Sequence, residues 1–413
     1  MRARWVGTVI RMRFRCPPTP RRSVPALLVA LAALLGLVGG ALAQTASAAR
    51  TASRPATPSA APAPWQARLQ AELSTIRLAD PHGAVGVHVR DLDTGLTVSQ
   101  HLDRPWYLAS MVKVPVSIAV MRGIEDGHFK LDTPLTVRAS DYVDGAGPTN
   151  KQPVGKPLSV RFLLDQMIIQ SDNMATDMLI GLVGVAEVNA LVDTLVPDGF
   201  GRITTLGEVR RQIYGRLAPH AERLSGRDLI LLHRQRGDAE RMQLLSHLLE
   251  TPVAQFHLPS LDAAYDAYYA SGLNTGRLEA YGQLLALLAD GKALSPKSTA
   301  YLLKVMTRVA TGTHRLKAGL PSDVSFAHKT GTQRRRICDA GLIRAVDADT
   351  DSERRVVVVA CVRDVLPLER AEAALMQVGA ALCKSGLVTR GVPDAPSCQA
   401  AALVRLPAAV VER

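Results

Sequence analysis

Apolar and polar residues recur with two different periods along the chain. Helical periodicity, with apolar residues three or four positions apart, runs through residues 65–78. Two alternating segments follow at 83–95 and 96–102, around an Asp-Thr-Gly turn, and they are typical of paired strands. The end of the chain predicts three successive strands and a last helix, at 323–332, 336–346, 354–365 and 366–386.

Helical periodicity dominates the region between these strands. One long helical stretch is predicted at 161–184, and much of 215–310 is also helical in pattern, including 224–235, 241–250 and 276–291. Strands at both ends with helices between them predict an α+β fold. We expect one antiparallel sheet, closed by the N- and C-terminal segments and flanked by helices, with a helical subdomain.

The first 43 residues have the three parts of a secretory signal: an arginine-rich start, a long apolar stretch and a small-x-small ending. They predict export, to the periplasm or the medium. The apolar stretch at 24–43 is also long enough to span a bilayer, so an N-terminal membrane anchor is the alternative if the signal stays uncleaved. The rest of the chain divides into an Ala, Pro, Ser and Thr-rich linker, a large domain and a C-terminal tail, at 44–64, 65–390 and 391–413.

Composition places the chain among globular proteins, with 47% hydrophobic and 21% charged residues. The net charge of +12 arises largely in residues 1–43, which hold seven arginines and no acidic residue. Without them 42 basic residues face 37 acidic ones, and this excess is too small to indicate a nucleic-acid partner. The triplet Arg334 to Arg336 is then either a feature of a local site or a solvated strand edge.

Four cysteines lie outside the signal segment: Cys338, Cys361, Cys383 and Cys398. They allow three connectivities, and we expect Cys383 to pair with Cys398 because the two follow the last helix and lie close in sequence. The sequence has no C-x-x-C and no close pair of histidines, so we expect no metal site and no cofactor.

The stretch ASMVKVPVSI places Ser110 and Lys113 three residues apart at the head of an apolar run. On a helix these two side chains share a face. A lysine in apolar surroundings loses affinity for its proton, and a neutral amine beside a hydroxyl is a general base beside a nucleophile. The alternative is a capping serine followed by a lysine that extends to water.

Two further motifs favour the chemical interpretation, namely Ser171-Asp172-Asn173 and Lys329-Thr330-Gly331. The order S-x-x-K, S-D-N and K-T-G, with the third motif on a predicted strand, is a known set. By these motifs and by its order of elements, the chain resembles the class A β-lactamase family over residues 65 to 390. The resemblance implies a β-lactamase/transpeptidase-like fold, with an insertion near residues 213–273.

The resemblance also implies a role for each catalytic group. Ser110 would be the nucleophile and Lys113 its base or proton shuttle, while Ser171 would relay a proton to the leaving nitrogen. The oxyanion hole would be formed by the backbone N–H groups of Ser110 and Thr332. Asp172 is expected to brace its loop rather than to react.

The remaining motif residues would hold the substrate. Asn173 would orient the amide side chain of the substrate, while Lys329, Thr330 and Thr332 would bind its carboxylate. Gly331 would leave room for a substrate lying along the strand.

One part of the family pattern is missing. Class A β-lactamases carry a glutamate, followed by a Leu-Asn pair, that activates the deacylating water. The corresponding segment here is ITTLGEVRRQIYG, in which Glu208 is the available carboxylate and no Leu-Asn follows. Glu208 is therefore either the deacylating base or a solvated residue paired with a neighbouring arginine, and we expect deacylation to be slow.

Two classes of function follow. The first is an exported serine hydrolase that opens β-lactam rings through a Ser110 acyl-enzyme, or that acts on the D-alanyl-D-alanine peptides which β-lactams mimic, in the manner of a penicillin-binding protein with slow deacylation. The second is a non-catalytic binding module. The intact set of Ser110, Lys113, Ser171, Asn173 and Lys329 favours the enzyme, because a binder needs no nucleophile and base together.

Overall fold

The computed structural model describes most of the chain between residues 62 and 398, namely 62–78, 80–346, 353–389, 391–393, 395, 396 and 398. The predicted signal segment, nearly all of the linker and most of the C-terminal tail lie outside these residues.

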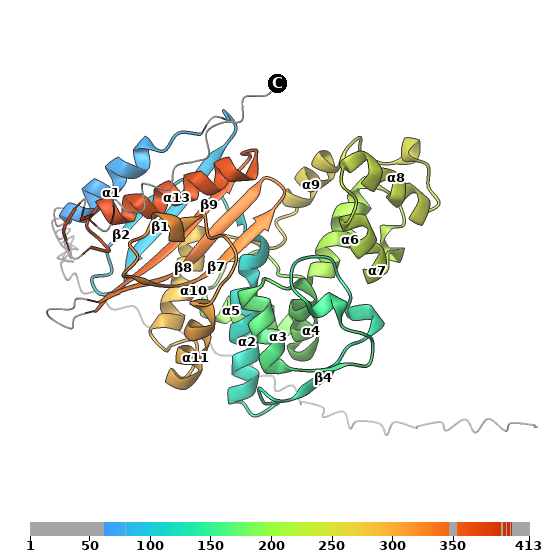
Figure 1. Cartoon of the computed structure of the whole chain (residues 1–413), viewed down its shortest axis with the longest axis horizontal. Helices are drawn as coiled ribbons and strands as arrows, with labels where there is room; N and C mark the ends of the chain where they lie inside the picture. The colour runs from blue at the N-terminus through green and yellow to red at the C-terminus, as the bar shows by residue number, and fades with distance from the viewer. Residues whose placement is uncertain are drawn as a thin grey trace, which may run out of the picture. The chain divides into compact units, whose positions relative to one another are not determined.

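A five-stranded antiparallel sheet organises the described part of the chain (Figure 1), in the order β2-β1-β9-β8-β7. The strands are β1 (Ala84–Asp91), β2 (Thr97–Gln100), β7 (Ser325–Gln333), β8 (Arg336–Val346) and β9 (Glu353–Arg363). The N-terminal hairpin therefore pairs with the C-terminal strand, which confirms the predicted closure of the sheet by both ends of the domain.

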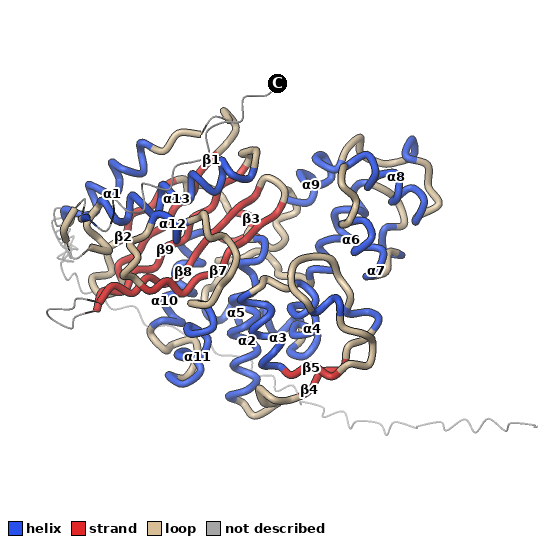
Figure 2. The backbone as a smooth tube through the Cα atoms, in the orientation of Figure 1, coloured by secondary structure: helices blue, strands red, loops and turns tan. Residues whose placement is uncertain are grey.

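The central strand β9 shows why the sheet is stable. Its alternate residues point to opposite faces, and both faces are buried. Val356, Val358 and Val362 pack in one core cluster, with the outer helices α1 (Pro64–Thr75) and α13 (Leu368–Lys384). Val357 and Val359 pack in the other cluster, against α10 (Leu278–Ala289) and the helical region. Figure 2 shows α1 and α13 together over one side of the sheet.

The helical region lies on the other face of the sheet and beyond its β7 edge (Figure 1). It contains α2 (Lys113–Glu125), α3 (Val160–Ile169), α4 (Asn173–Val183), α5 (Val185–Leu195), α6 (Leu206–Leu217), α7 (Gly226–His233), α8 (Asp238–Leu248), α9 (Leu261–Tyr269) and α11 (Pro296–Met306). The short α12 (Leu316–Gly319) packs instead against α13, on the first face. Two short strand pairs support the helical region, β3 (Trp106–Tyr107) with β6 (Thr275–Gly276) and β4 (Pro134–Thr136) with β5 (Pro157–Ser159). The segment predicted as an insertion thus forms helices from α6 onward.

The expected continuous helix over 161–184 is wrong. The structure ends α3 at Ile169 and begins α4 at Asn173. Ser171 has a φ of 59°, in the left-handed region that a helix interior excludes. The side chain of Asp172 then caps α4 by accepting from the N–H of Ala175 at 2.9 Å. The break therefore falls on the S-D-N motif itself.

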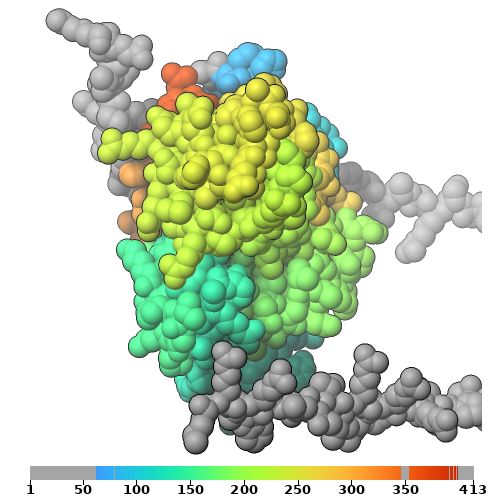
Figure 3. Space-filling view, turned by 90° about the vertical axis from the view of Figure 1, so that its right-hand side faces the viewer, coloured from blue at the N-terminus to red at the C-terminus, as the bar shows by residue number. Residues whose placement is uncertain are grey.

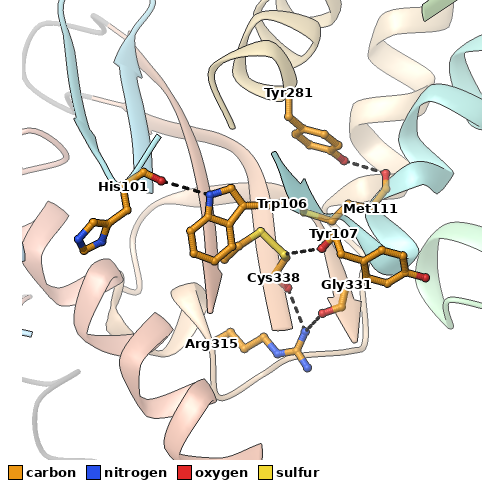
Figure 4. The surroundings of a disulfide bond; sticks show 9 residues. His101, Trp106, Tyr107, Met111, Tyr281, Arg315, Gly331 and Cys338 are labelled. Carbon is orange, nitrogen blue, oxygen red and sulfur yellow. Dashed lines mark hydrogen bonds between the residues drawn. A yellow bond between two sulfur atoms is a disulfide. The ribbon is translucent and has the colours of Figure 1, made fainter. Parts of the chain in front are cut away.

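Two disulfides link the C-terminal part of the domain. Cys383 pairs with Cys398, which confirms the predicted bridge. Cys338 pairs with Cys361 across β8 and β9, and Figure 4 shows this bridge beside Trp106. This second pairing was not singled out among the three connectivities.

Among the residues that the structure describes, no single helix is long and apolar enough to cross a membrane. The helices α4 and α5 meet that test of length and composition only when they are taken together as a pair bent by 84°.

Candidate active site

Ser110 lies on a single 3-10 turn, Ala109–Val112, that leads directly into α2. Lys113 is the first residue of α2, and its Nζ donates to Ser110 Oγ at 3.1 Å. The same amine donates to Ser171 O at 2.6 Å and to Asn173 Oδ1 at 2.8 Å. Lys113 is fully buried, so the alternative of a lysine that extends to water is wrong.

Ser171 lies between two lysines. Its Oγ accepts from Lys113 Nζ at 3.2 Å and from Lys329 Nζ at 3.0 Å. The left-handed backbone at Ser171 turns this hydroxyl away from the helical path and toward both amines. The neighbouring Asp172 accepts from the N–H of Thr149 at 2.9 Å as well as capping α4, which confirms its bracing role. The structure thus joins the three sequence motifs in one hydrogen-bonded chain.

Burial sets the proton affinity of both lysines. Loss of hydration disfavours the ammonium form and lowers the pKa of Lys113 to about 7, although Asp172 and Asp177 act in the opposite direction. Burial lowers the pKa of Lys329 well below its usual value, and the positive charges of Lys113 and Arg315 lower it further. A neutral amine is therefore accessible next to Ser110 near neutral pH.

The K-T-G motif lies on β7, the edge strand that faces the serine turn. Lys329 Nζ also donates to Thr330 O at 3.0 Å, and Thr330 Oγ1 hydrogen-bonds Thr311 Oγ1 at 2.5 Å. The reason expected for Gly331 needs correction. A side chain at this position would collide with the carbonyl of Leu108, so glycine here lets the serine turn pack on β7.

Arg315, which sequence reasoning missed, fixes the end of β7 (Figure 4). It is 3% exposed and donates to Gly331 O and Cys338 O, each at 3.0 Å, and to Thr332 Oγ1 at 2.7 Å. Its Nε pairs with Glu372 of α13 at 3.0 Å. Arg315 thus holds the strand that carries the K-T-G motif, and its guanidinium lies one hydrogen bond from the Thr332 hydroxyl.

These groups open into a pocket of about 620 Å³. Its lining comes from all three motifs and from the α6–α9 segment: Ser110, Gly145, Ala146, Ser171, Asn173, Arg210, His233, Thr311, Thr330, Thr332, Gln333, Arg334, Arg335, Ile337, Val365, Leu366 and Leu368. Within the described ranges, no group of three or more His, Cys, Asp or Glu side chains is arranged to hold a metal ion.

Glu208 is not among the residues that line this pocket. It lies in the first turn of α6, where its carboxylate accepts from Gln212 Nε2 at 2.7 Å. The expected arginine partner is therefore wrong, since the neighbour is a glutamine. The start of α6 is held by Asp177 of α4, which accepts from the N–H groups of Leu206 and Gly207 at 2.6 and 2.8 Å.

The arginine triplet joins the β7–β8 turn to the α6–α9 segment. Arg334 pairs with Asp238 of α8 and Asp262 of α9, at 2.7 and 2.5 Å. Arg335 pairs with Asp266 of α9 at 2.6 Å. Figure 3 shows this segment, in yellow-green, covering much of one face of the molecule. The triplet is thus a local site feature, because two of its members also line the pocket.

The fold and the site together define a class. An antiparallel sheet flanked by helices, with a serine and two buried lysines joined through a second serine, is the architecture of the β-lactamase-like serine hydrolases. The sequence pattern described as the β-lactamase enzyme family matches residues 68–385. The chain belongs to this family.

Individual relatives are distant. Beta-lactamase L2 of Stenotrophomonas maltophilia is 32% identical over 123 residues, covering 30% of this chain and 40% of the relative. Beta-lactamase of Rhodobacter capsulatus is 34% identical over 112 residues, covering 27% of this chain and 38% of the relative. The chain thus aligns with about two fifths of the length of these curated relatives.

Among solved structures, the chain is similar to a mutant of PBP-A in an acyl-enzyme complex with penicillin G. The TM-score is 0.55 at 21% identity, covering 77% of this chain and 94% of that one. This likeness shows the fold.

Proposed function

We propose that the protein is a class A-type serine hydrolase that opens β-lactam rings through an acyl-enzyme on Ser110. The observation that carries the proposal is the hydrogen-bonded chain from Ser110 through Lys113 and Ser171 to Lys329. Neutral Lys113 takes the proton of Ser110 while Oγ forms a bond to the lactam carbonyl carbon. The C–N bond then breaks, Ser171 gives its proton to the leaving nitrogen, and Lys113 returns a proton to Ser171.

The same geometry supports the proposed binding roles. Asn173 is fixed by Lys113 and by the carbonyl of Asp144, to which its Nδ2 donates at 2.8 Å, so its amide can orient the acyl amide of a substrate. Thr330 and Thr332 line the pocket, and with Lys329 they would bind the substrate carboxylate. The backbone N–H groups of Ser110 and Thr332 would stabilise the oxyanion. The acyl-enzyme that PBP-A forms with penicillin G gives a precedent in the same fold.

A second function, that of a penicillin-binding protein with slow deacylation, is favoured by the pocket lining. No aspartate or glutamate is among the described residues that line the pocket, and Glu208 lies outside them. A water at the acyl-enzyme would therefore meet no carboxylate among the described residues that line the pocket, and Lys113 is the next candidate for the base. The physiological substrate would then be a D-alanyl-D-alanine peptide. The complete nucleophile and base make a purely binding role the weaker alternative.

Export to the periplasm or the medium belongs to the same proposal. Residues 1–43 carry the secretory pattern, and the two disulfides support an oxidising compartment. An exported enzyme of this kind would protect its host cell from β-lactams if turnover is fast.

Mass spectrometry with benzylpenicillin tests the nucleophile. We expect one adduct, on the peptide that contains Ser110, and none in Ser110→Ala. Ser74→Ala is the matched control, because Ser74 is exposed and its hydroxyl bonds only the carbonyl of Ala71 among the residues that the structure describes. A wild-type protein that is neither labelled by benzylpenicillin nor able to hydrolyse it, or an adduct that persists in Ser110→Ala, would reject the proposal.

A time course of nitrocefin hydrolysis separates the two functions. A burst followed by slow turnover would identify the slowly deacylating protein, whereas rapid steady hydrolysis without a burst would identify an efficient β-lactamase.

A further inference from the structure

One wall of the active-site pocket carries only basic and neutral polar groups. Arg210 of α6, His233 of α7 and the turn residues Arg334 and Arg335 line it together with Asn173. The acidic partners of these arginines are not among the pocket-lining residues that the structure describes. Asp144 lines only the adjoining pocket, which it shares with Arg210, His233 and Arg334, so in the described residues this part of the active-site pocket is lined by cations and not by their carboxylate partners.

Arg210 is the best placed of these groups. Its Nε donates to both carboxylate oxygens of Asp144, at 2.8 and 2.9 Å, which fixes the guanidinium. Asp144 in turn accepts from Asn173 through its backbone carbonyl. Arg210 is thereby tied to the residue proposed to hold the acyl amide of the substrate.

The terminal amino groups of Arg210 remain available for a ligand. Within the described part of the chain, the hydrogen bonds of Arg210 to acceptor atoms run through Nε alone. Its side chain is 15% exposed, which leaves access from the pocket but little hydration. A carboxylate suits such a donor, because a planar guanidinium can bind both of its oxygens.

His233 adds to the same wall without adding negative charge. Its Nδ1 lies 3.3 Å from Asp144 Oδ2, so that one carboxylate positions both the arginine and the histidine. Burial lowers the pKa of His233, with Arg210 and Arg241 acting in the same direction and Asp144 against it. The imidazole is then largely neutral at pH 7. The negative charge of Asp144 is balanced by its ion pair with Arg210.

We propose that Arg210, with His233, Arg334 and Arg335 around it, forms a subsite for a negatively charged substituent on the acyl side of the substrate. The inference rests on the proposed function and adds a substrate class to it: β-lactams or acyl-D-amino-acid peptides that carry a carboxylate close to the acyl amide. The subsite disfavours an ammonium group at the same position, because like charges meet there at low hydration.

Three penicillins with the same phenyl ring test the subsite. At the carbon between the phenyl ring and the acyl carbonyl, carbenicillin carries a carboxylate, benzylpenicillin a hydrogen and ampicillin an amine. Carbenicillin and ampicillin both carry an added polar group there but with opposite charge, so a difference between them reports the effect of charge and not of an added group alone. The measured quantity is the second-order rate constant for acylation of Ser110. We expect carbenicillin to react about tenfold or more faster than ampicillin, with benzylpenicillin between them, since hydrogen bonds to charged groups contribute on that scale.

Variants then assign the preference to Arg210. Arg210→Gln should bring the ratio of carbenicillin to ampicillin close to one. The double variant Asp144→Asn/Arg210→Gln should do the same without leaving a buried carboxylate unpaired. Arg227→Gln is the matched control, because Arg227 is exposed on α7, stacks on Tyr142 and is not among the pocket-lining residues. It removes the same charge and should keep the wild-type ratio.

Each outcome separates the two proposals. If the wild type reacts equally fast with carbenicillin and ampicillin, or if folded variants at Arg210 keep the wild-type ratio, the subsite is refuted while the proposed function stands. An equal fall of the ratio in Arg227→Gln would also refute it, because a long-range charge effect would then suffice. If none of the three penicillins either labels Ser110 or is hydrolysed, the proposed function fails and the subsite fails with it.

Discussion

The pKa of Lys113 leads to a defined pH profile for acylation. An ordinary lysine, with a pKa of about 10.4, is almost entirely protonated at neutral pH. Burial lowers the pKa of Lys113 to about 7, which leaves roughly a thousand times more neutral amine at pH 7 than an ordinary lysine has. If this amine takes the proton of Ser110, the acylation rate should rise about tenfold per pH unit below pH 7 and level off above about pH 8.

The same shift links Lys113 to stability. The pKa is lower in the folded than in the unfolded chain, so the unfolded chain binds the proton more tightly and the free energy of unfolding rises with pH above about 7. Between pH 7 and pH 9 the rise from this one group is about 2 kcal/mol. Lys329 contributes with the same sign, and the charge of Lys113 is one cause of its lowered pKa. The difference between the wild type and Lys113→Met therefore measures the part that belongs to Lys113 together with its coupling to Lys329.

Stopped-flow measurement of the acylation phase from about pH 5 to about pH 9 checks the rate, and urea unfolding at pH 7 and pH 9 checks the stability. Lys113→Arg should lower the acylation rate by roughly 10² to 10⁴, since its guanidinium stays charged. An acylation rate that is flat across this range would refute Lys113 as the neutral base, and so would a rate that still rises about tenfold per pH unit between about pH 8 and about pH 9, as a lysine with an ordinary pKa requires.

Three further predictions concern groups around the site. Glu208→Gln should leave acylation and deacylation within about twofold of wild type, because Glu208 bonds Gln212 outside the pocket; a deacylation rate that falls by the roughly 10² or more of a lost base would contradict this placement. Gly331→Ala should destabilise the fold by about 1–3 kcal/mol and slow acylation, because its Cβ would meet the carbonyl of Leu108; unchanged denaturant unfolding and acylation would count against the close packing. Arg315→Met should lower the free energy of unfolding by about 3–5 kcal/mol, because it leaves Glu372 without its partner; a loss below about 1 kcal/mol in urea titration would show that the ion pair is weak.

The motif residues could be predicted from the sequence because each chemical role demands a residue type. The motifs S-x-x-K, S-D-N and K-T-G made Ser110, Lys113 and Lys329 recognisable without coordinates, and the structure joins these residues through hydrogen bonds. The sheet was equally accessible, since its strands are apolar and alternate or run continuously. The break at Ser171 was not predictable from periodicity, because apolar residues continue at helical spacing on both sides while a serine with positive φ is rare.

Features that depend on long-range contacts were missed. Arg315 acts through carbonyl groups of two strands and a carboxylate of the last helix, and nothing in its local sequence indicates these partners. The placement of Glu208 depends on how Asp177 holds the start of α6. The bridge between Cys338 and Cys361 could have been found, because pairing the two predicted strands as a hairpin sets these residues opposite each other.

The central position of β9 has a consequence for the order in which the protein can become active. β9 pairs with β1 on one side and β8 on the other, although β1 ends at Asp91 and β9 begins only at Glu353. A nascent chain that stops short of residue 353 already contains Ser110, Ser171 and Lys329. However, its two strand pairs, β1 with β2 and β7 with β8, lack the strand β9 that joins them in the sheet. Such non-local pairing folds slowly and late. We therefore expect the three motifs to come together only after β9 has been synthesised, and fragments that lack β9 should not assemble the site.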